Sequence, residues 1–485
     1  MAAVSADSRA RLARIPEAVR HVHLIGVGGS AMAALAGMLA HRGFHVTGSD
    51  TQVYEPTASI LKRLRIQVQA GYDPAHLAAP DLAVVGNVVM RSNPEAAALL
   101  ASAIPYVSMP EALWHFFLRE RRVLMVAGTH GKTTSTAMMA RVLESAGRDP
   151  SMLVGGVARD FAANYRLGGG TDFVIEGDEY DTAFFDKGPK FLHYRARGAI
   201  VTGVEFDHAD IYRDLDHVQA SFRALAAQLD AGRVLVVCAD FPHALTATAA
   251  TAARRLTFGL SAGEFRAVDI AINPDGAHFA IARDGVILAR GLHLPVGGRM
   301  NVANALGVWV LLKEFGLTDD ELSEGLASFS GVARRQEIVG EAGEVIIIDD
   351  FAHHPTAIRV TLEAMAERYA GRRLIAAFEP RSNSARRAVF QEGFATAFDR
   401  AARVYLAPVY FKENDPLPVE DRLDVPALAR AISGRGPTAA ACDSVDQIVE
   451  RIAAEARAGD VVLCMSNGPF ENLPARLYVE LGRRG

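Results

Sequence analysis

Short apolar runs alternate along the chain with stretches that have helical spacing of apolar residues. The run 123–127, VLMVA, is too short for a helix and leads into a glycine-containing turn, which is typical of a strand buried on both faces of a parallel sheet. Residues 135–146 and a stretch ending near Phe315 have the length and spacing of helices. The runs that predict strands are 21–27, 44–48, 82–86, 123–127, 173–175, 199–204, 345–348, 374–378, 404–407 and 461–465. This alternation predicts an α/β fold.

The number of residues predicts more than one domain. At 485 residues the chain exceeds what a single hydrophobic core normally supports. The predicted strands fall into three groups along the chain. We therefore expect an N-terminal Rossmann-like domain over 1–118, a central domain over 119–332 and a C-terminal Rossmann-like domain over 333–485.

The central domain begins with a strand that runs into the turn GTHGKTT. Gly128 and Gly131 let the backbone approach an anion, and N–H groups at the start of the following helix favour negative charge. Lys132 would reach the β- and γ-phosphates of a nucleoside triphosphate, and Thr133 would offer its hydroxyl to Mg²⁺. Val126 stands where the strict motif has its first glycine, and a chance turn is the alternative. The flanking strand and helix favour a P-loop ATPase type of domain.

Two further strands of this domain end in polar residues. Strand 173–175 is followed by EGDEYD, with four carboxylates within six residues. Clustered acids usually form a solvated loop, but Glu176 directly follows a buried strand and is well placed to hold Mg²⁺, which takes oxygen ligands. Strand 199–204 runs into EFDHAD. There His208 is either a solvated histidine or a metal ligand or phosphate contact, and we favour the second interpretation.

A glycine turn also follows the first strand of the chain. Gly26, Gly28 and Gly29 precede an alanine-rich helix, and Ala31 takes the third glycine position of the dinucleotide-binding fingerprint, where alanine is also accepted. Asp50 ends the next strand, where such folds place an acceptor for a ribose hydroxyl. Dinucleotide, other nucleotide and purely structural interpretations all remain open at this point.

In the third domain, strand 345–348 ends in DDFAHHP. Asp350 and His354 therefore belong to a dense polar cluster at the carboxyl end of a strand, where α/β sheets bind ligands. A helix N-terminus with proline in its first turn would account for the same residues without any function. Arg381 follows another strand, and it is a candidate contact for a peptide carboxylate because arginine binds carboxylates with two parallel hydrogen bonds.

Composition narrows the class of protein. Hydrophobic residues make up 50% of the chain, charged residues 22%, and the formal net charge is −5, which argues against a general nucleic-acid or membrane binder. The three cysteines are far apart without a CxxC pair, which supports neither a disulfide framework nor a cysteine zinc site. The sequence has no run of eighteen apolar residues and no apolar export segment near its start. We expect a cytoplasmic protein that binds small anionic molecules, as a monomer or homodimer.

With these motifs placed, the chain resembles the Mur ligases, the ATP-dependent enzymes that join amino acids or peptides to UDP-N-acetylmuramic acid for bacterial cell walls. The resemblance covers nearly the whole chain, and its ordered motifs are GVGGSAM, GTHGKTT, EGDEYD, EFDHADIY, GRMNVANA, RRQE and DDFAHHPT. Within the family, DTAFFDKGPKFLHY, EPRSN and SNGPF are similar to the branch that attaches a recovered tripeptide, L-alanyl-γ-D-glutamyl-meso-diaminopimelate. The alternative branch adds free L-alanine. An NAD-dependent oxidoreductase built on the first glycine turn is an alternative of a different class.

The resemblance implies ATP and Mg²⁺ as cofactors, with UDP-N-acetylmuramate and the tripeptide as substrates. ATP would contact Gly128, Thr129, Gly131, Lys132, Thr133, Thr134, Asn301, Asn304, Arg335 and Asp350. The UDP sugar would bind at Gly26, Gly28, Gly29, Ser30 and Asp50. Metal would be held by Thr133, Glu176 and His208, and the residues acting in catalysis would be Lys132, Glu176, His208 and His354.

The sequence departs from the family pattern at two positions. Several members use a carbamylated lysine about fifteen residues after the histidine that matches His208, where this chain has Arg223 and no lysine anywhere from 191 to 312. This absence fits the two branches named above. The family also usually has alanine where Gly177 stands, and we expect extra backbone freedom beside the metal site there.

Overall fold

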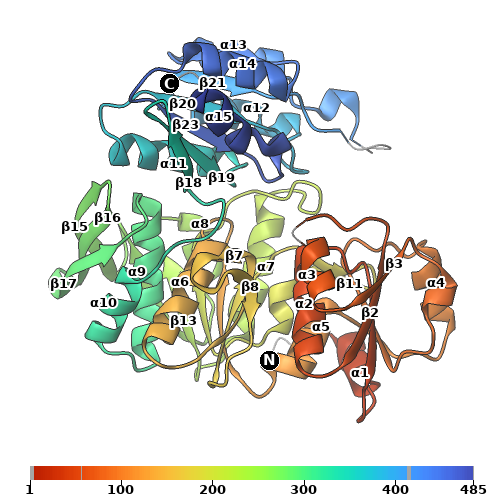
Figure 1. The fold of residues 1–485 in the computed structure, drawn as a ribbon. Helices are drawn as coiled ribbons and strands as arrows, with labels where there is room; N and C mark the ends of the chain where they lie inside the picture. Colours follow the sequence, from red (N-terminus) through yellow and green to blue (C-terminus); the bar gives the residue numbers. More distant parts are fainter. Residues whose placement is uncertain (1–4, 56, 412–416, 484–485) are drawn as a thin grey trace. The chain divides into compact units, whose positions relative to one another are not determined.

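The computed structural model describes residues 5–55, 57–411 and 417–483, and they form two compact units. Unit 1 contains the described residues up to Glu205, together with Leu215–Phe265 and Leu306–Gly325. Unit 2 contains Phe206–Asp214, Arg266–Ala305 and the described residues from Leu326 onward. The ribbon in Figure 1 labels the helices and strands of both units.

The first sheet of unit 1 has the strand order β3-β2-β1-β4-β5, and all its strand pairs are parallel. Its strands are β1 (His21–Ile25), β2 (His45–Asp50), β3 (Gln67–Ala70), β4 (Leu82–Val85) and β5 (Tyr106–Ser108). The accompanying helices are α1 (Ala6–Ala13), α2 (Ser30–His41), α3 (Thr57–Arg63), α4 (Pro94–Ala101) and α5 (Met109–Leu113). Strand order and helices give the expected Rossmann-like fold.

Capping residues set the starts of two of these helices. The Asn93 side chain accepts hydrogen bonds from two backbone N–H groups at the start of α4, and proline occupies the first helical position. At α5, Ser108 and Glu111 form a reciprocal capping box. Glu111 is buried and also forms a salt bridge of 2.8 Å with Arg11 of α1. The N-terminal helix is thereby attached to the first sheet.

The second sheet of unit 1 contains strands in the order β14-β13-β12-β6-β9-β7-β8. The pairs are parallel except for β7 with β8. The strands are β6 (Arg122–Ala127), β7 (Ser151–Ala158), β8 (Ala163–Arg166), β9 (Asp172–Gly177), β12 (Gly198–Val201), β13 (Val234–Cys238) and β14 (Arg254–Gly259). The helices of this part are α6 (Lys132–Ser145), α7 (Leu215–Gln228), α8 (Pro242–Ala247) and α10 (Asp319–Ala327), and α9 (Arg299–Glu314) begins in unit 2 and ends in unit 1.

A small hairpin carries the DTAFFDKGP segment to the core of the first sheet. Its strands are β10 (Asp181–Ala183) and β11 (Asp186–Pro189). Phe184 and Phe185 pack against that core, and the ring centroids of Phe185 and Tyr106 are 5.1 Å apart. The hairpin is therefore an apolar link between the two sheets of unit 1.

The predicted strands are confirmed. The start of one helix and the end of one strand differ from the prediction for a physical reason. Helix α6 begins at Lys132, three residues before the predicted start, because Gly131 is in the left-handed region with φ 77° and the chain turns there into the helix. Strand β12 ends at Val201 rather than residue 204. The next residues leave the sheet to bond the GTHGKTT turn, where the Thr129 N–H donates to the Gly203 carbonyl at 3.0 Å.

The main sheet of unit 2 has the order β18-β19-β23-β20-β21-β22, with only β18 antiparallel. Its strands are β18 (Glu337–Ala342), β19 (Val345–Asp350), β20 (Leu374–Phe378), β21 (Arg403–Leu406), β22 (Thr438–Ala441) and β23 (Val461–Met465). Its helices are α11 (Pro355–Arg368), α12 (Gln391–Ala397), α13 (Val425–Ser433), α14 (Val445–Glu455) and α15 (Leu473–Gly482). Unit 2 also contains β15 (Phe265–Asn273) from Arg266 onward, and the antiparallel pair β16 (Gly276–Arg283) and β17 (Val286–Leu294).

Both faces of this sheet are covered. Ile348 and Phe378 pack in one cluster with residues of α11, α12 and α13, whereas Ile347 and Ala377 pack in another with residues of α14 and α15. Neighbouring strand residues thus point to opposite helix layers, which explains the continuous apolar runs in the sequence. The Rossmann-like character predicted for the C-terminal domain is confirmed, and the boundaries at 118/119 and 332/333 stay predictions.

Gly177 makes room for a neighbouring methionine. It is the last residue of β9 and pairs with Ala127 of β6, so the sheet fixes its backbone. A Cβ placed on Gly177 would lie 3.0 Å from the Sδ of Met125 and 3.1 Å from the Cβ of Ala127. The structure therefore gives Gly177 a packing role, in place of the extra backbone freedom expected from the sequence.

We expect Gly177→Ala to destabilise the protein by about 1–2 kcal/mol, because an added methyl overpacks a filled interior. Urea denaturation of the two proteins measures this difference. Gly188→Ala is the matched control, since a Cβ there meets nothing within 4 Å, and its stability should stay within about 0.5 kcal/mol of the parent. A Gly177→Ala protein as stable as the parent would contradict the packing role.

Candidate active site

The GTHGKTT turn is shaped by glycines and closed by the segment after β12. Gly128 has φ 129°, and a Cβ there would lie 2.3 Å from the Thr202 hydroxyl oxygen and 2.9 Å from the backbone of Gly203. The Thr202 hydroxyl donates to the carbonyls of Ala127 and His130. Only a residue without a side chain fits at position 128, and the turn is held closed on itself.

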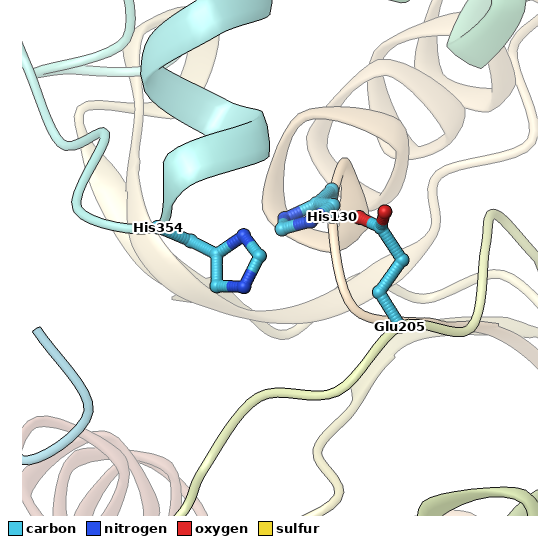
Figure 2. Close-up of side chains that lie close together, drawn as sticks. All are labelled: His130, Glu205 and His354. Atoms are coloured by element: carbon cyan, nitrogen blue, oxygen red, sulfur yellow. Dashed lines mark hydrogen bonds and ion pairs between the residues drawn. The ribbon is translucent and has the colours of Figure 1, made fainter. Parts of the chain in front are cut away.

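The next part of the same segment supports the turn from the side. The Glu205 N–H donates to the Thr129 hydroxyl at 2.9 Å. The Nε2 atom of His130 lies 2.7 Å from a carboxylate oxygen of Glu205, and Figure 2 shows the two side chains side by side. Both turn residues between the two glycines are therefore fixed before any ligand is considered.

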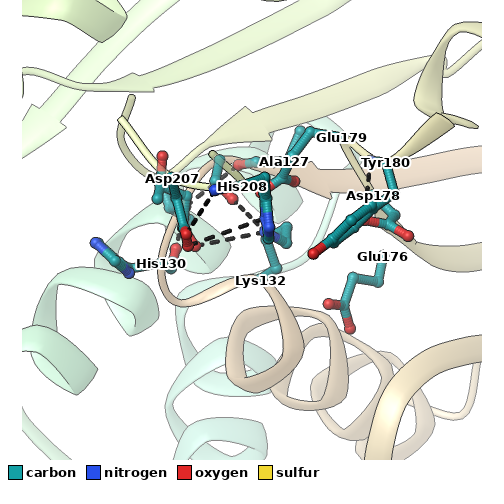
Figure 3. Close-up of polar contacts among 12 residues, drawn as sticks. Ala127, His130, Lys132, Glu176, Asp178, Glu179, Tyr180, Asp207 and His208 are labelled. Carbon is teal, nitrogen blue, oxygen red and sulfur yellow. Dashed lines mark hydrogen bonds and ion pairs between the residues drawn. The ribbon is translucent and has the colours of Figure 1, made fainter. Parts of the chain in front are cut away.

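Lys132 is held by a carboxylate that the sequence interpretation did not assign a role. Its Nζ donates to the Gly128 carbonyl at 2.7 Å and to Glu179 at 2.8 Å. Figure 3 shows Lys132 among the acidic side chains of EGDEYD. Burial disfavours the ammonium, but the charges of Glu179 and Glu176 outweigh this and raise the pKa of Lys132. A phosphate bound at the turn would compete with Glu179 for this lysine, whose raised pKa favours the ammonium form.

Glu176 lies against the start of α6. The Thr133 hydroxyl donates to one of its carboxylate oxygens at 3.1 Å, and the Gly155 N–H donates to the other at 2.7 Å. Burial raises the pKa of Glu176, although Lys132 partly counteracts this. A buried carboxylate beside a hydroxyl fits a hard divalent cation, because the cation offsets the cost of burying the negative charge.

The other two acids of EGDEYD form salt bridges. Asp178 bonds Lys190 at 2.5 Å, and burial is outweighed by that lysine, which lowers the pKa of Asp178 to about 2. Asp181 bonds Lys187 at 2.9 Å. The solvated-loop interpretation therefore does not describe this segment, since each carboxylate has a specific partner.

The glycine turn of the first sheet is closed by Asp50. Gly26 has φ 82°, and the Gly28 N–H donates to the Asp50 carboxylate at 2.8 Å. A Cβ on Gly28 would lie 2.8 Å from the same carboxylate oxygen. Tyr72 also bonds Asp50, and burial together with that negative charge raises the pKa of Tyr72 to about 12. Asp50 thus supports the turn as well as standing at the predicted ribose position.

The remaining residues of this predicted site lie at the start of α2. Gly29 occupies the position before the helix, and Ser30 is its first residue. The Ser30 hydroxyl accepts a hydrogen bond from Asn164 of β8 at 3.2 Å. The helix N-terminus that follows the turn favours a phosphate group.

In unit 2, His208 lies in a cluster with three other titratable residues. The His208 N–H donates to the Asp207 carboxylate at 2.6 Å. Burial opposes ionisation of Asp207, but nearby histidine charge lowers its pKa overall. The histidines responsible, in order of effect, are His208, His354 and His353. Asp207 belongs to this cluster, and the sequence interpretation gave it no role. Its place directly before His208 was the available signal.

His354 has a structural role as well as its predicted position. It caps α11 by accepting a hydrogen bond from the Thr356 N–H at 3.3 Å, and Figure 2 shows it directly before the first turn of the helix. Its Nε2 lies 3.2 Å from the Phe206 carbonyl. The predicted proline-started helix is confirmed, and it fixes His354 beside the loop that contains His208.

Asp350 and Arg335 are fixed next to each other in unit 2. Asp350 accepts hydrogen bonds at 2.7 Å from the N–H groups of Gln336 and Ala352, and burial raises its pKa against the opposing charge of Arg335. The Arg335 guanidinium lies 4.6 Å from the centroid of the Phe351 ring. Asp350 uses both oxygens to hold the backbone on either side of the strand end.

The two predicted asparagines lie in the first turns of α9. Asn301 donates to the Gly297 carbonyl at 2.8 Å, and Asn304 donates to the Asn301 side-chain oxygen at 3.4 Å. Arg223 lies on the exposed side of α7 and donates to the Asp216 carbonyl. The residue at the carbamylated-lysine position is therefore engaged with its own helix.

Arg381 is oriented by its neighbours. Its guanidinium lies 3.7 Å from the centroid of the Tyr410 ring and donates to Glu379 at 3.3 Å. A Cβ on Gly468 would meet the Arg381 side chain at 2.2 Å, so the arginine lies across that glycine. One quarter of the side chain is exposed, which leaves N–H groups accessible for a carboxylate.

A glycine turn with its lysine and hydroxyl at a helix start, next to a buried carboxylate, defines the class: an α/β protein with a P-loop type of nucleotide site. The chain belongs to the Mur ligase family. Residues 21–121 match the Mur ligase family catalytic domain, residues 126–312 the Mur ligase middle domain, and residues 334–468 the Mur ligase glutamate ligase domain. Such ligases are ATP-dependent and form ADP. Membership of this family therefore excludes the alternative of an NAD-dependent oxidoreductase.

Three relatives mark its place in the family. The UDP-N-acetylmuramate–L-alanyl-γ-D-glutamyl-meso-2,6-diaminoheptandioate ligase of Haemophilus influenzae is 36% identical over 465 residues, covering 96% of this chain and 99% of the relative. A UDP-N-acetylmuramate–L-alanine ligase of an Acidovorax strain is 34% identical over 472 residues, covering 95% of this chain and 96% of the relative. The crystal structure of a murein peptide ligase from Psychrobacter arcticus has a TM-score of 0.70 at 32% identity and covers 96% of this chain and 99% of that one.

None of the helices in the described ranges is both long and apolar enough to cross a membrane.

The buried carboxylate gives a prediction in which stability and activity move in opposite directions. Because the pKa of Glu176 is raised above its ordinary value of 4.5, its ionised form costs stability once the pH exceeds that raised pKa. Without metal, Glu176→Gln should therefore melt at the same or a higher temperature than the parent at pH 8, and this advantage should vanish below about pH 4.5. Ligation should fall by about 100-fold or more, since the metal would lose its carboxylate.

Thermal melts from pH 4 to 8 and a phosphate-release assay measure both effects. Glu144→Gln, on the outside of α6 beside Arg141, is the control and should keep its activity. A Glu176→Gln protein that melts well below the parent at pH 8 would contradict the buried-charge argument.

Proposed function

We propose that this chain joins the tripeptide L-alanyl-γ-D-glutamyl-meso-diaminopimelate to UDP-N-acetylmuramate at the expense of ATP, in peptidoglycan recycling. The observation that carries the proposal is the 36% identity over 96% of the chain to a ligase named for that reaction. The structure of a murein peptide ligase that covers 96% of the chain supports it. The cytoplasmic location, the monomer or homodimer state and the lack of nucleic-acid binding stay predictions.

The reaction we propose has two steps. The bond between the γ-phosphorus and the β–γ bridging oxygen of ATP breaks, and the phosphoryl group forms a bond to the lactyl carboxylate of the muramyl sugar, giving an acyl phosphate and ADP. The neutral amine of the tripeptide then attacks the acyl carbon, the bond from that carbon to the phosphate oxygen breaks, and the amine nitrogen releases one proton to the departing phosphate, which leaves an amide. A carboxylate is a poor electrophile, so the enzyme contributes activation by ATP, positioning and charge neutralisation.

Within unit 1, Lys132 would hold the β- and γ-phosphates at the turn, with Thr129 and Thr134 beside it. Thr133 and Glu176 would hold Mg²⁺, which supplies positive charge to the phosphates when bound. The glycine turn with Ser30 and Asp50 would bind the UDP part of the sugar nucleotide. The contacts that hold these residues in place support these roles.

Within unit 2, Asn301, Asn304, Arg335 and Asp350 would contact the nucleotide, and His354 would line the reacting end. His208 would contribute to a second metal or phosphate contact. The carboxylate of Asp207, whose pKa the neighbouring histidines lower, supports a polar site there.

The acceptor separates this proposal from the nearest alternative, the ligase that adds free L-alanine. That alternative is favoured by the 34% identity to such a ligase over 95% of the chain. Purified enzyme with ATP, Mg²⁺ and UDP-N-acetylmuramate should release phosphate when tripeptide is supplied and stay near background with L-alanine. Phosphate release with L-alanine and none with tripeptide would show that L-alanine is the acceptor and would overturn the proposal.

Arg381 is the candidate contact for the acceptor's carboxylate. We expect Arg381→Ala to raise the KM for tripeptide by about 10- to 100-fold, which is the loss of one charge-assisted hydrogen-bonded pair, while the KM for ATP is unchanged. Arg381→Lys should recover little of this, because lysine lacks the planar pair of donors. Initial-rate kinetics with each substrate varied in turn measure the KM for tripeptide and the KM for ATP separately.

Arg430→Ala is the control for this experiment, since Arg430 is an exposed arginine of α13 in the same unit. It should leave both KM values unchanged. An Arg381→Ala enzyme with the parental KM for tripeptide would remove Arg381 from the acceptor site without affecting the proposed reaction.

A further inference from the structure

Unit 1 contains a second site of concentrated charge, at the opposite end of its central sheet from the GTHGKTT turn. A cavity of ≈ 310 Å³ is lined by Arg121, Arg122, Val123, Arg195, Arg197 and Arg233. Arg122 is the first residue of β6, and the P-loop turn follows the last residue of that strand. Six strand residues span about 20 Å, so the cavity is separate from the predicted ATP site.

The cavity has more positive than negative charge. Arg122 forms two hydrogen bonds with Asp172, at 2.5 and 2.8 Å, and Arg233 forms one with Asp230 at 3.2 Å. Among the described residues, the other three arginines, Arg121, Arg195 and Arg197, form no salt bridge. Five guanidinium groups and no carboxylate line the cavity, so positive charge is in excess there although the chain has a net charge of −5.

Contacts to aromatic rings and backbone hold these arginines in place. The Arg195 guanidinium lies 3.9 Å from the centroid of the Trp114 ring. Arg122 lies over the Phe315 ring at 5.2 Å. Arg233 donates to the carbonyls of Arg195 and Ala196 at 2.9 and 2.6 Å. Orientation by these contacts lowers the entropy that each side chain loses when it binds an anion.

The backbone and the electrostatics of Arg195 agree with a binding role. Arg195 has φ 51°, a left-handed conformation that costs energy for a residue other than glycine and is enriched at functional positions. Burial and the positive charge of Arg233 lower the pKa of Arg195. The Arg195 and Arg197 side chains are exposed to solvent, so a dissolved anion can reach them and relieve the repulsion.

We propose that this cavity binds a small molecule carrying a diphosphate or two neighbouring phosphate groups, without a metal ion. Guanidinium groups bind phosphate oxygens through paired N–H donors, and several of them converge on one volume of the size of a small-ligand pocket. The P-loop site differs from this cavity, because its lysine is surrounded by carboxylates that call for a divalent cation alongside phosphate. Metal dependence therefore distinguishes the two sites.

The test uses Trp114 as a reporter for the cavity. The chain has two tryptophans, and Trp309→Phe leaves Trp114 alone. Titration of this full-length variant with pyrophosphate in the presence of EDTA should give a saturable change in fluorescence. Adding Arg195→Ala and Arg197→Ala should weaken the apparent affinity by at least about tenfold per guanidinium removed. Adding Lys132→Ala instead should leave the fluorescence response unchanged.

Isothermal titration calorimetry of the chain with both tryptophans, with pyrophosphate in EDTA, is the second measurement of binding. It does not depend on the Trp309→Phe substitution and can be used if that variant fails to fold. Arg290→Ala with Arg430→Ala removes the same net charge from exposed positions outside the cavity and should keep the affinity for pyrophosphate. The Arg195→Ala, Arg197→Ala protein should retain ligation in the absence of pyrophosphate. The proposal is overturned if pyrophosphate binding in EDTA is absent, or if it is lost with Lys132→Ala and unchanged by the two cavity substitutions.

Discussion

The balance of buried charge around Lys132 is the interaction on which the central site depends. Its ammonium contacts Glu179, while Glu176 and Asp178 lie near enough to raise its pKa. With Lys190 on Asp178, three carboxylates face two ammonium groups. If all are ionised, the cluster has one net negative charge in a buried place, which is costly. A divalent cation would offset that charge and would add the positive charge that a triphosphate needs.

The same physical rule explains why polar residues gather where they do. Each parallel strand ends at the same side of its sheet, so the loops that follow β6, β9 and β12 meet there. Their backbone N–H and carbonyl groups leave the ladder and need other partners. Here the Glu205 N–H bonds the Thr129 side chain, and the His130 carbonyl bonds the Thr202 side chain. The turn is therefore built before a ligand arrives, and this reduces the ordering cost of binding.

Sequence pattern predicted the strands that are continuous apolar runs, such as β6, β20 and β23, because burial on both faces leaves such a run. It missed the parallel strands β3, β5, β13, β14 and β22. Strands β3 and β22 have exposed and half-buried positions, β5 has three residues, and β13 is a buried apolar run that the sequence interpretation overlooked. The pattern also did not predict β7, β8 or the β10–β11 hairpin. Strand β7 contains two glycines and has exposed and half-buried positions, and β11 contains Gly188 and Pro189, which are depleted in strands. Strand β15 and the antiparallel pair β16–β17 were also missed, because β15 and β17 alternate between buried and exposed positions and no continuous run results.

For the site, polar residues at or just beyond the carboxyl end of a buried strand were predictable from the sequence alone, among them Lys132, Glu176 and Asp350. Their partners were not, because the contacts join distant parts of the chain. Glu179 binds a lysine 47 positions earlier, and Gly155 supports Glu176 from another strand.

The two ends of the central sheet differ in charge in a way that neither composition nor motif shows. Acidic side chains dominate the end that carries the P-loop, so phosphate binding there would need the positive charge of a lysine and a cation. Arginines dominate the other end, with Asp172 and Asp230 as their hydrogen-bonded carboxylate partners. A chain with an overall excess of acids can hold such a cluster because short-range contacts to Trp114 and Phe315 stabilise it locally. Net charge constrains non-specific association with polyanions, whereas specific anion binding depends on where a few guanidinium groups converge.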